Sequence, residues 1–222
     1  MTSYIIRSAI FGIAALFAFT FIPAGTLYYW QGWLYIATWI VVGSAYTAYV
    51  AKHDPALLKR RTEAGVAHEK EPAQKIIVSF LYVAFILLVA LPPLDFRFRW
   101  SRMPWYVSVI GDVFIAISFY IFYLVATVNT YAAANVRVEE GQKVISIGVY
   151  GIVRHPMYAG ALLLVVGTPV ALGSWWSVAL LIPFFPVLLW RLLDEEKILV
   201  RDLPGYIEYM QKVQYRLIPQ VW

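Results

Sequence analysis

The sequence predicts an all-α protein that spans a membrane several times. Of its 222 residues, 61% are hydrophobic and only 14% are charged, whereas a soluble domain carries about 25% charged residues. The apolar residues gather into six stretches, and a helix that crosses a bilayer needs roughly 20 of them. We therefore expect about six transmembrane helices, with a helical hairpin near the C-terminus and a cytoplasmic tail after it.

Each expected span begins or ends at a recognisable signal. The N-terminal apolar run is long and shows no small-residue cleavage site, so we expect it to be retained rather than removed as a signal peptide. A connection rich in Tyr and Trp, which are typical of membrane interfaces, separates it from the second span. We expect Pro92 and Pro93 to end the third span, and Gly173 and Ser174 to form the tight turn before the sixth. The six spans are expected at residues 4–22, 33–51, 76–91, 105–128, 157–172 and 175–193.

The polar segments between the spans give an orientation. Basic residues favour the cytoplasmic side of a membrane. If the N-terminus is cytoplasmic, six spans return the C-terminus to the same side, together with every lysine and arginine except Arg97, Arg99 and Arg102. The segment 52–75 then reads as a solvated cytoplasmic loop. We take residues 1–222 as one domain, with N-terminal spans in 1–128 and the candidate functional residues in 129–222.

The clearest site signal is a polar break, GVYGIVRHPMYAG, at residues 148–160. Proline favours the first position of a helix, so Pro156 is expected to open a membrane helix with His155 as its cap. The positive end of that helix, beside Arg154, suits an anionic group. Tyr158 lies three residues beyond His155 and is therefore expected on the same helical face.

A second polar cluster lies at the inner end of the last span. Arg191 and Glu195 are four residues apart and share a helix face. One reading is a structural ion pair worth about 0.3–0.5 kcal/mol. The other is a carboxylate that holds a cationic ligand group beside an arginine that holds an anionic one. Pro183 and Pro186 weaken the helix before this point and permit a bend.

Other polar features point to no separate site. Asp112 lies within the fourth span, where a carboxylate is costly and often functional; since it is near the end of the span, an interfacial acid is equally open, and we leave it outside the site. The spacing of Tyr206, Tyr209 and Val213 suggests a short amphipathic helix on the membrane surface. The sequence has no Cys, so thiolate metal sites and iron–sulfur clusters are excluded. We expect no metal and no nucleic-acid partner.

The order of motifs in the C-terminal two-fifths of the chain resembles that of a known family. A polar connection ends in GVYGIVRHPMYAG, and a tight hairpin leads to RLLDEEKIL and then to LPGYIEYMQKVQYRLIP. Over about residues 129–219, this pattern resembles the isoprenylcysteine carboxyl methyltransferase family of membrane enzymes and, more broadly, the phospholipid methyltransferases. The resemblance implies an enzyme that transfers a methyl group from S-adenosylmethionine to a lipophilic or membrane-associated acceptor.

The resemblance also implies roles for particular residues. Arg191 would contact the substrate, and Arg154 and Arg191 would be the catalytic residues. Gln142 departs from the family pattern, because eukaryotic members have a histidine there. The chemistry agrees, because the carboxylate of Glu195 suits the ammonium group of the cofactor. A carboxylate or thiolate acceptor needs no general base. The residues expected to bind the cofactor are Asn135, Gln142, Lys143, Val144, Ile145, Tyr150, His155, Pro156, Met157, Tyr158 and Glu195.

The acceptor and two alternative functions stay open. A prenylated cysteine, a phospholipid amine and a small thiol all fit an apolar-walled site. We expect the polar cofactor to arrive from the cytoplasm and an apolar acceptor from the inner leaflet, with its anionic head stopped at Arg191. The alternatives are an NADPH-dependent sterol-type reductase, for which Arg137 and Lys143 would hold the 2′-phosphate, and a non-enzymatic membrane protein. A transporter would carry ionisable residues along its spans, where we see essentially Asp112 alone.

Overall fold

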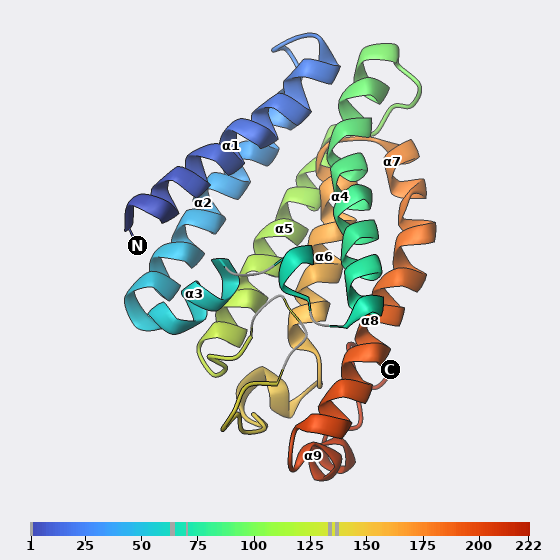
Figure 1. The fold of residues 1–222 in the computed structure, drawn as a ribbon. Helices are drawn as coiled ribbons and strands as arrows, with labels where there is room; N and C mark the ends of the chain where they lie inside the picture. Colours follow the sequence, from blue (N-terminus) through green and yellow to red (C-terminus); the bar gives the residue numbers. More distant parts are fainter. Residues whose placement is uncertain (1, 63–64, 70, 133–134, 136–137) are drawn as a thin grey trace. The chain divides into compact units, whose positions relative to one another are not determined.

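The computed structural model describes residues 2–62, 65–69, 71–132, 135 and 138–222, with side chains from residue 7 onward. It is 75% helix, and no strand occurs among these residues. Figure 1 traces the helices in chain order. They are α1 (Thr2–Ala24), α2 (Trp30–His53), α3 (Pro55–Thr62), α4 (Pro72–Phe98), α5 (Trp105–Ala126), α6 (Pro156–Ala171), α7 (Trp175–Ala179), α8 (Leu181–Asp202) and α9 (Tyr206–Lys212), with 3-10 turns η1 (Val66–His68) and η2 (Gly148–Gly151).

Five of the described helices are long and apolar enough to cross a membrane. Their candidate spans begin at Arg7, Trp30, Pro72, Trp105 and Trp175. Many large apolar side chains on these helices are exposed, including Phe11 and Ile182, as expected for helices that face lipid. The prediction of an all-α membrane protein is therefore confirmed. Helix α6 is apolar but has only 16 residues, so the count of six spans stays a prediction.

The chain forms two compact units, and helices α2, α4, α5, α6 and α8 contribute residues to both, whereas α1 belongs to unit 1 alone. Unit 1 comprises Met1–Ser44, Val83–Ala116 and Leu163–Ile182, and unit 2 comprises Ala45–Tyr82, Ile117–Leu162 and Pro183–Trp222. Whether they act as one domain stays a prediction.

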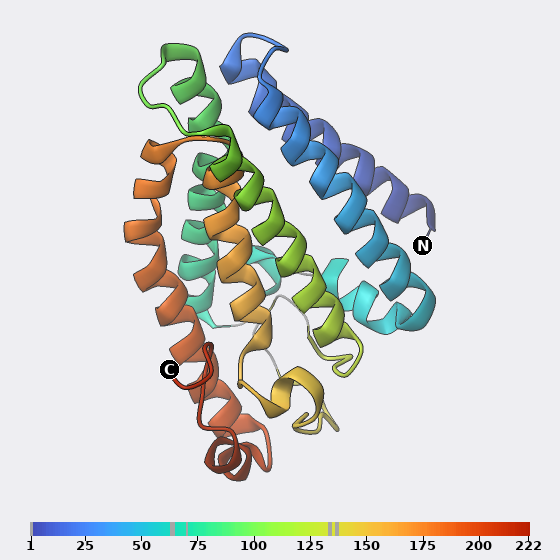
Figure 2. The same cartoon turned by 180° about the vertical axis from the view of Figure 1, so that it is seen from behind.

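In unit 1, α1 packs against the first part of α2, as Figures 1 and 2 show. The Trp33 ring lies 5.8 Å from that of Phe17 and 4.8 Å from that of Phe21, centroid to centroid. Helices α5 and α6 approach each other closely, because a Cβ atom added at Gly111 would lie 2.2 Å from the backbone nitrogen of Ala171. Only glycine permits that approach.

The prediction that Pro92 and Pro93 end the third span is wrong, because α4 continues to Phe98. Proline lacks the N–H that would bond the carbonyl four residues earlier, and for Pro92 that is the carbonyl of Leu88. The Ser177 hydroxyl donates a hydrogen bond to this carbonyl at 3.2 Å. A side chain from another helix thus satisfies the exposed carbonyl, which is how membrane helices accommodate proline.

Two further expectations about the elements need correction. The loop expected at 52–75 contains α3 and η1; the Asp54 carboxylate accepts a hydrogen bond from the Leu57 N–H at 2.9 Å and caps α3. The last expected span is interrupted at Leu180, between α7 and α8, and α8 then continues to Asp202. The carboxylates of the EE motif therefore lie within a helix rather than in the tail.

Unit 1 buries two carboxylates. Asp95, 1% exposed, accepts hydrogen bonds from the Ser101 N–H at 2.7 Å, from the Ser101 hydroxyl at 2.6 Å and from the Ser174 hydroxyl. Asp112 is 6% exposed, and neither of its oxygens has a well-formed hydrogen bond within the described part of the chain, although Thr38 lies close enough to interact. Asp112 is thus a buried acid rather than one in contact with water.

Candidate active site

The polar break at residues 148–156 is held in place by the C-terminal tail. After the η2 turn, the backbone N–H groups of Arg154 and His155 donate to the carbonyls of Tyr215 and Arg216, each at 2.9 Å. The His155 carbonyl accepts hydrogen bonds from the Tyr158 N–H at 3.0 Å and from the Ala159 N–H at 3.1 Å, and the second of these is the first α-helical bond. Helix α6 begins at the next residue after His155, so the prediction that Pro156 opens this helix is confirmed.

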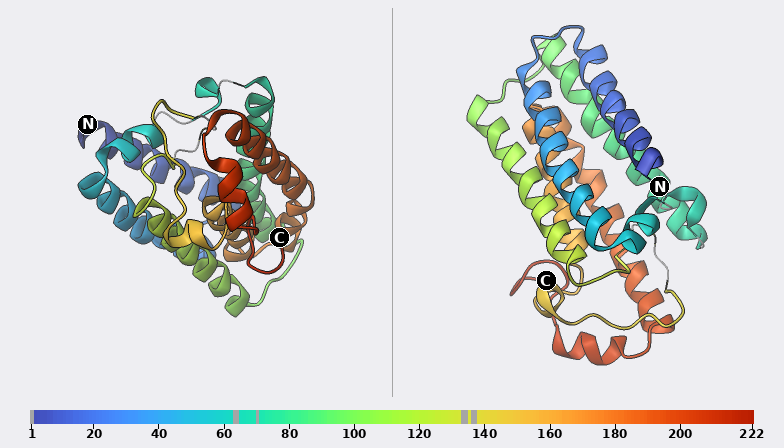
Figure 3. Two further views of the ribbon diagram at one scale, coloured as in Figure 1. Left: turned by 90° about the horizontal axis from the view of Figure 1, so that it is seen from below. Right: turned by 90° about the vertical axis from the view of Figure 1, so that its left-hand side faces the viewer.

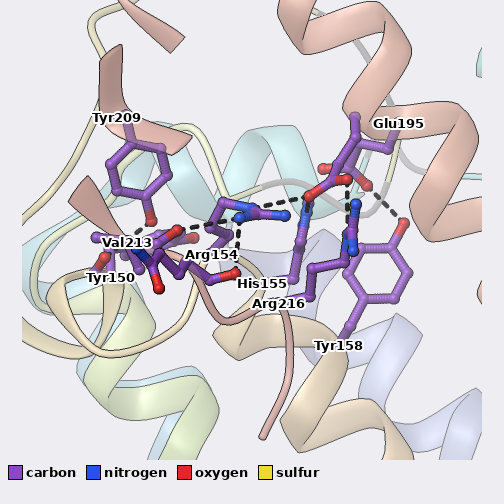
Figure 4. A network of polar contacts seen from close by, with 10 residues as sticks. Tyr150, Arg154, His155, Tyr158, Glu195, Tyr209, Val213 and Arg216 are labelled. Carbon is purple, nitrogen blue, oxygen red and sulfur yellow. Dashed lines mark hydrogen bonds and ion pairs between the residues drawn. The ribbon is translucent and has the colours of Figure 1, made fainter. Parts of the chain in front are cut away.

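Glu196 of α8 joins three basic side chains in this network; Figure 4 labels the three, Arg154, His155 and Arg216. Its Oε1 accepts from Arg154 Nε at 2.9 Å and lies 3.2 Å from His155 Nε2, and its Oε2 accepts from Arg216 Nε at 2.8 Å. Arg154 also donates to two tail carbonyls at 3.0 Å each. Glu196 is 6% exposed, so these charges compensate one another away from water. The anion beside the helix start is therefore a carboxylate of the chain itself.

Glu195 and Arg191 lie on α8 close to this network, and both interact with Tyr158. The Tyr158 hydroxyl donates to Glu195 Oε2 (Figure 4). Arg191 is buried; it donates from Nη1 to Gln74 Oε1 at 2.8 Å and from Nη2 to Glu69 Oε1 at 3.1 Å. The ion pair of Arg191 with Glu69 joins α8 to the segment that precedes α4. Sequence reasoning, which paired Arg191 with Glu195 by spacing, did not anticipate it.

A pocket in unit 2 opens beside these residues. Of the residues expected to bind the cofactor, all except Pro156 line it, and Arg154 lines it as well. Arg191 is not among the lining residues; it interacts electrostatically with two residues that line the pocket, Tyr158 and Glu195. The pocket walls that sequence reasoning missed are Asn129, Tyr131, Ala132, Leu199, Leu203, Tyr206 and Tyr209.

Two hydrogen bonds hold Tyr150 at the pocket, one from Asn129 and one from Tyr209 of α9. Its carbonyl accepts from the Tyr209 hydroxyl, and its own hydroxyl accepts from Asn129 Nδ2, each at 2.8 Å. Burial raises the pKa of Tyr150 to about 12, so its phenol stays protonated at neutral pH and keeps one O–H to donate. Helix α9 buries Tyr206 and Tyr209 against Leu203 and lines the pocket; its expected place on the membrane surface stays a prediction.

Helix α3 holds the polar connection that forms another wall. Arg60 donates to the Glu139 carboxylate from Nε and Nη2 at 2.8–3.0 Å and lies over the Tyr131 ring. The Gly65 N–H donates to Asn135 Oδ1 at 2.9 Å. The pairing with Glu139 raises the pKa of Arg60. Arg137, considered for a 2′-phosphate, lies outside the described residues. The left view of Figure 3 shows this connection and α9 at the same end of the unit, where Val144 packs against the Tyr206 cluster.

Comparison with known proteins shows which family the chain resembles. The chain matches the phospholipid methyltransferase family over residues 106–203. It is 29% identical over 195 residues to the probable protein-S-isoprenylcysteine O-methyltransferases of Oryza sativa subsp. indica and subsp. japonica, which covers 82% of this chain and 93% of each relative. Protein-S-isoprenylcysteine O-methyltransferase B of Arabidopsis thaliana is 38% identical over 85 residues, 36% of this chain and 41% of the relative.

These matches support the resemblance of the chain to an isoprenylcysteine carboxyl methyltransferase-like family. The chain is accordingly a membrane methyltransferase. These relatives are all named methyltransferases, which gives the reductase and the non-enzymatic alternatives no support. The matched stretch ends at residue 203, so it contains Tyr150, Glu195 and Glu196 of the methyltransferase but not α9 or Arg216.

Proposed function

We propose that this pocket binds S-adenosylmethionine and that the chain transfers its methyl group to the carboxylate of a prenylated cysteine. The observation that carries the proposal is Glu195, a carboxylate oriented by Tyr158 on the wall of a pocket rich in tyrosine. The ammonium group of the cofactor needs such an acid partner, and a charged hydrogen bond of this kind contributes about 1.5–3 kcal/mol. The names of the rice and Arabidopsis relatives supply the acceptor class.

The polar atoms of the pocket fit the rest of the cofactor. Asn135 Nδ2 and the Tyr206 hydroxyl are buried and have no hydrogen-bond partner within the described part of the chain, and both residues line the pocket. A buried polar group without a partner is costly, and the hydroxyls and ring nitrogens of an adenosine would satisfy both. The faces of Tyr131 and Tyr209 suit the flat adenine and the positive sulfonium.

When bound, S-adenosylmethionine supplies an electrophilic methyl carbon: the acceptor oxygen bonds to it while the carbon–sulfur bond breaks, and the electron pair remains on sulfur. A carboxylate acceptor releases no proton, so the chain needs no general base. Its contribution is to position the reactants and exclude water, which supply much of the rate in such displacements. In this proposal Arg154 is a positioning residue, because its guanidinium ties α6 and the tail to Glu196.

We assign Arg191 to the acceptor side. Its buried guanidinium, held by Glu69 and Gln74, lies one helical turn before Glu195. An acceptor that arrives sideways from the inner leaflet would meet this positive charge with its carboxylate, while the cofactor arrives from the cytoplasm past the 129–145 connection and α9. Neither ligand then crosses the phase that solvates it poorly. With this arrangement we expect both termini in the cytoplasm.

The match to the phospholipid methyltransferase family favours a phospholipid amine as the second candidate acceptor. An ammonium group would first have to lose a proton, whereas a carboxylate would not. The decisive experiment incubates the purified protein with methyl-labelled S-adenosylmethionine and, separately, an S-farnesylated cysteine, phosphatidylethanolamine or a small thiol. We expect label in the farnesylated cysteine as an ester that alkali releases. Label in the phospholipid alone would overturn the proposed acceptor, and label in no acceptor would contradict the proposal as a whole.

A further inference from the structure

A second cavity lies in unit 1, away from the residues of the methyltransferase pocket in the sequence. It is formed by the connection between α1 and α2, the end of α4 and the segment that leads into α5. Arg97, Arg99 and Arg102 line it together with Gln31 and Ser101. We call it the arginine cavity. These three arginines are the same basic residues that the charge-based orientation left outside the cytoplasm.

The three guanidinium groups are exposed and unpaired. Within the described part of the chain, none of them makes an ion pair or a hydrogen bond; Arg97 lies over the Phe98 ring, 5.5 Å from its centroid. The acid close by in sequence, Asp95, is buried and already accepts hydrogen bonds from Ser101 and Ser174. Three guanidinium groups against one buried carboxylate leave the arginine cavity with a net positive charge among the described residues.

The backbone that carries these arginines is fixed. Besides the bonds from Ser101 to Asp95, the Trp175 indole N–H donates to the Arg102 carbonyl at 3.3 Å. Arg99 has a φ of 56°, a left-handed conformation that non-glycine residues adopt rarely and that persists where surrounding contacts impose it. The arginines thus lie on a turn whose backbone conformation is already fixed. Ligand binding would therefore not incur the entropy cost of ordering this backbone.

Glycine at position 25 also shapes the arginine cavity. A Cβ atom added there would lie 3.3 Å from Arg97 Cζ, and the φ of Gly25 is +66°. Both the space beside the guanidinium and the turn between α1 and α2 therefore depend on glycine.

The position along the chain puts the arginine cavity at a membrane surface. Helices α4 and α5 are both candidate membrane spans, and the segment between them carries Arg99 and Arg102. Large aromatic side chains beside it are exposed, namely Tyr28, Trp100 and Trp105, and such residues mark the depth of the lipid headgroups. Guanidinium groups match phosphate oxygens in geometry and form strong paired hydrogen bonds with them.

We propose that the arginine cavity binds the phosphate of an anionic phospholipid. The phosphate lies among the three guanidinium groups, and the acyl chains extend along the exposed apolar faces of the helices. A free phosphate ion offers the same oxygens, but the exposed aromatic side chains of Tyr28, Trp100 and Trp105 favour the lipid. The proposal does not depend on S-adenosylmethionine or on the acceptor, so it stands or falls separately from the proposed function.

The test measures lipid binding to the full chain in detergent by native mass spectrometry, with titration of phosphatidylglycerol against phosphatidylcholine. The variant R97Q/R99Q/R102Q should bind phosphatidylglycerol about tenfold or more weakly, since it loses the charges and the paired hydrogen bonds. The control variant K52Q/K75Q/K212Q removes three exposed charges elsewhere and should retain tight binding. R97K/R99K/R102K keeps the charge without the planar geometry and should give intermediate affinity.

Thermal unfolding of each variant identifies any that fails to fold. Tight phosphatidylglycerol binding that survives in a folded R97Q/R99Q/R102Q variant would overturn the proposal. So would equal losses in the arginine and lysine variants, since the effect would then come from overall charge. Inorganic phosphate provides a further arm: if it displaces phosphatidylglycerol at equal concentration, the site recognises free phosphate and the lipid assignment is wrong.

Discussion

Two adjacent carboxylates of α8 are predicted to respond differently to the same substitution. Glu196→Gln removes the charge that three basic side chains share, of which Arg154 and His155 are as buried as Glu196 itself. Removing one partner of a buried pair costs about 3–5 kcal/mol; because glutamine retains one acceptor oxygen and Arg216 is partly exposed, we expect about 3 kcal/mol. For a chain of this length that corresponds to a thermal midpoint lower by roughly 6–12 °C.

Glu195→Gln should instead leave the midpoint nearly unchanged, since glutamine can still accept from Tyr158. It should weaken S-adenosylmethionine binding by about 1.5–3 kcal/mol, or roughly ten- to more than a hundredfold. Thermal unfolding in detergent and calorimetric titration of both variants separate the two effects. Glu71→Gln, which disturbs only an exposed ion pair with Arg201, is the matched control and should change neither. The reasoning fails if Glu196→Gln unfolds like the parent, or if Glu195→Gln loses stability and keeps its affinity.

Further substitutions test other parts of the structure. Asp112→Asn should raise the thermal midpoint, because it removes a buried charge with poor hydrogen bonding. Asp95→Asn should instead destabilise the fold by about 1–3 kcal/mol, because its donors lose a charged acceptor. The opposite pair of shifts would contradict both descriptions. Folding raises the pKa of Tyr150 to about 12, from an ordinary value near 10. The folded state therefore favours the neutral phenol over the phenolate. Its contribution to stability is therefore complete below pH 10 and lost as the pH rises towards 12; denaturation at pH 9–11.5 should show this slope, and Tyr150→Phe should flatten it. Arg191→Ala should raise the acceptor KM or lower turnover, with cofactor affinity nearly unchanged. The double variant Arg191→Ala/Glu69→Gln should recover folding but not turnover. Loss of cofactor binding in that folded double variant would place Arg191 in the cofactor pocket.

The long apolar helices were predictable because membrane spans leave their signal in local composition. Hydrophobic runs gave α1, α2, α4 and α5 to within a few residues, apart from the C-terminal end of α4. That end was missed because the hydroxyl that satisfies the Leu88 carbonyl belongs to Ser177, 89 residues away. The helix propensity of a residue includes the cost of a proline, but it contains no information on a hydrogen-bond partner so distant in sequence.

The pocket was predictable where one segment carries several of its residues. The stretch from Gln142 to Tyr158 contributes most of the expected wall, and the start of α6 follows from Pro156 alone. Spacing along α8 singled out Glu195 beside Arg191, but it could not reveal the role of Glu196, because its partner Arg154 comes from 42 residues earlier.

Helix α3 shows a local signal that was present but overlooked. Asp54 followed by Pro55 is a regular start of a helix, with a capping acid and a proline in the first position. The charge of the segment favoured a solvated loop instead. The consequence for the site, the ion pair of Arg60 with Glu139 across 79 residues, is tertiary and could not be read from the sequence.

The central claim is that the Tyr150–Glu195 pocket holds S-adenosylmethionine. Calorimetric titration of the purified protein with S-adenosylmethionine tests it most directly, with Glu195→Gln titrated alongside. We predict saturable binding by the parent chain and binding at least about tenfold weaker by the variant. Absence of both heat and thermal stabilisation at millimolar cofactor, in protein shown to be folded, would contradict the account.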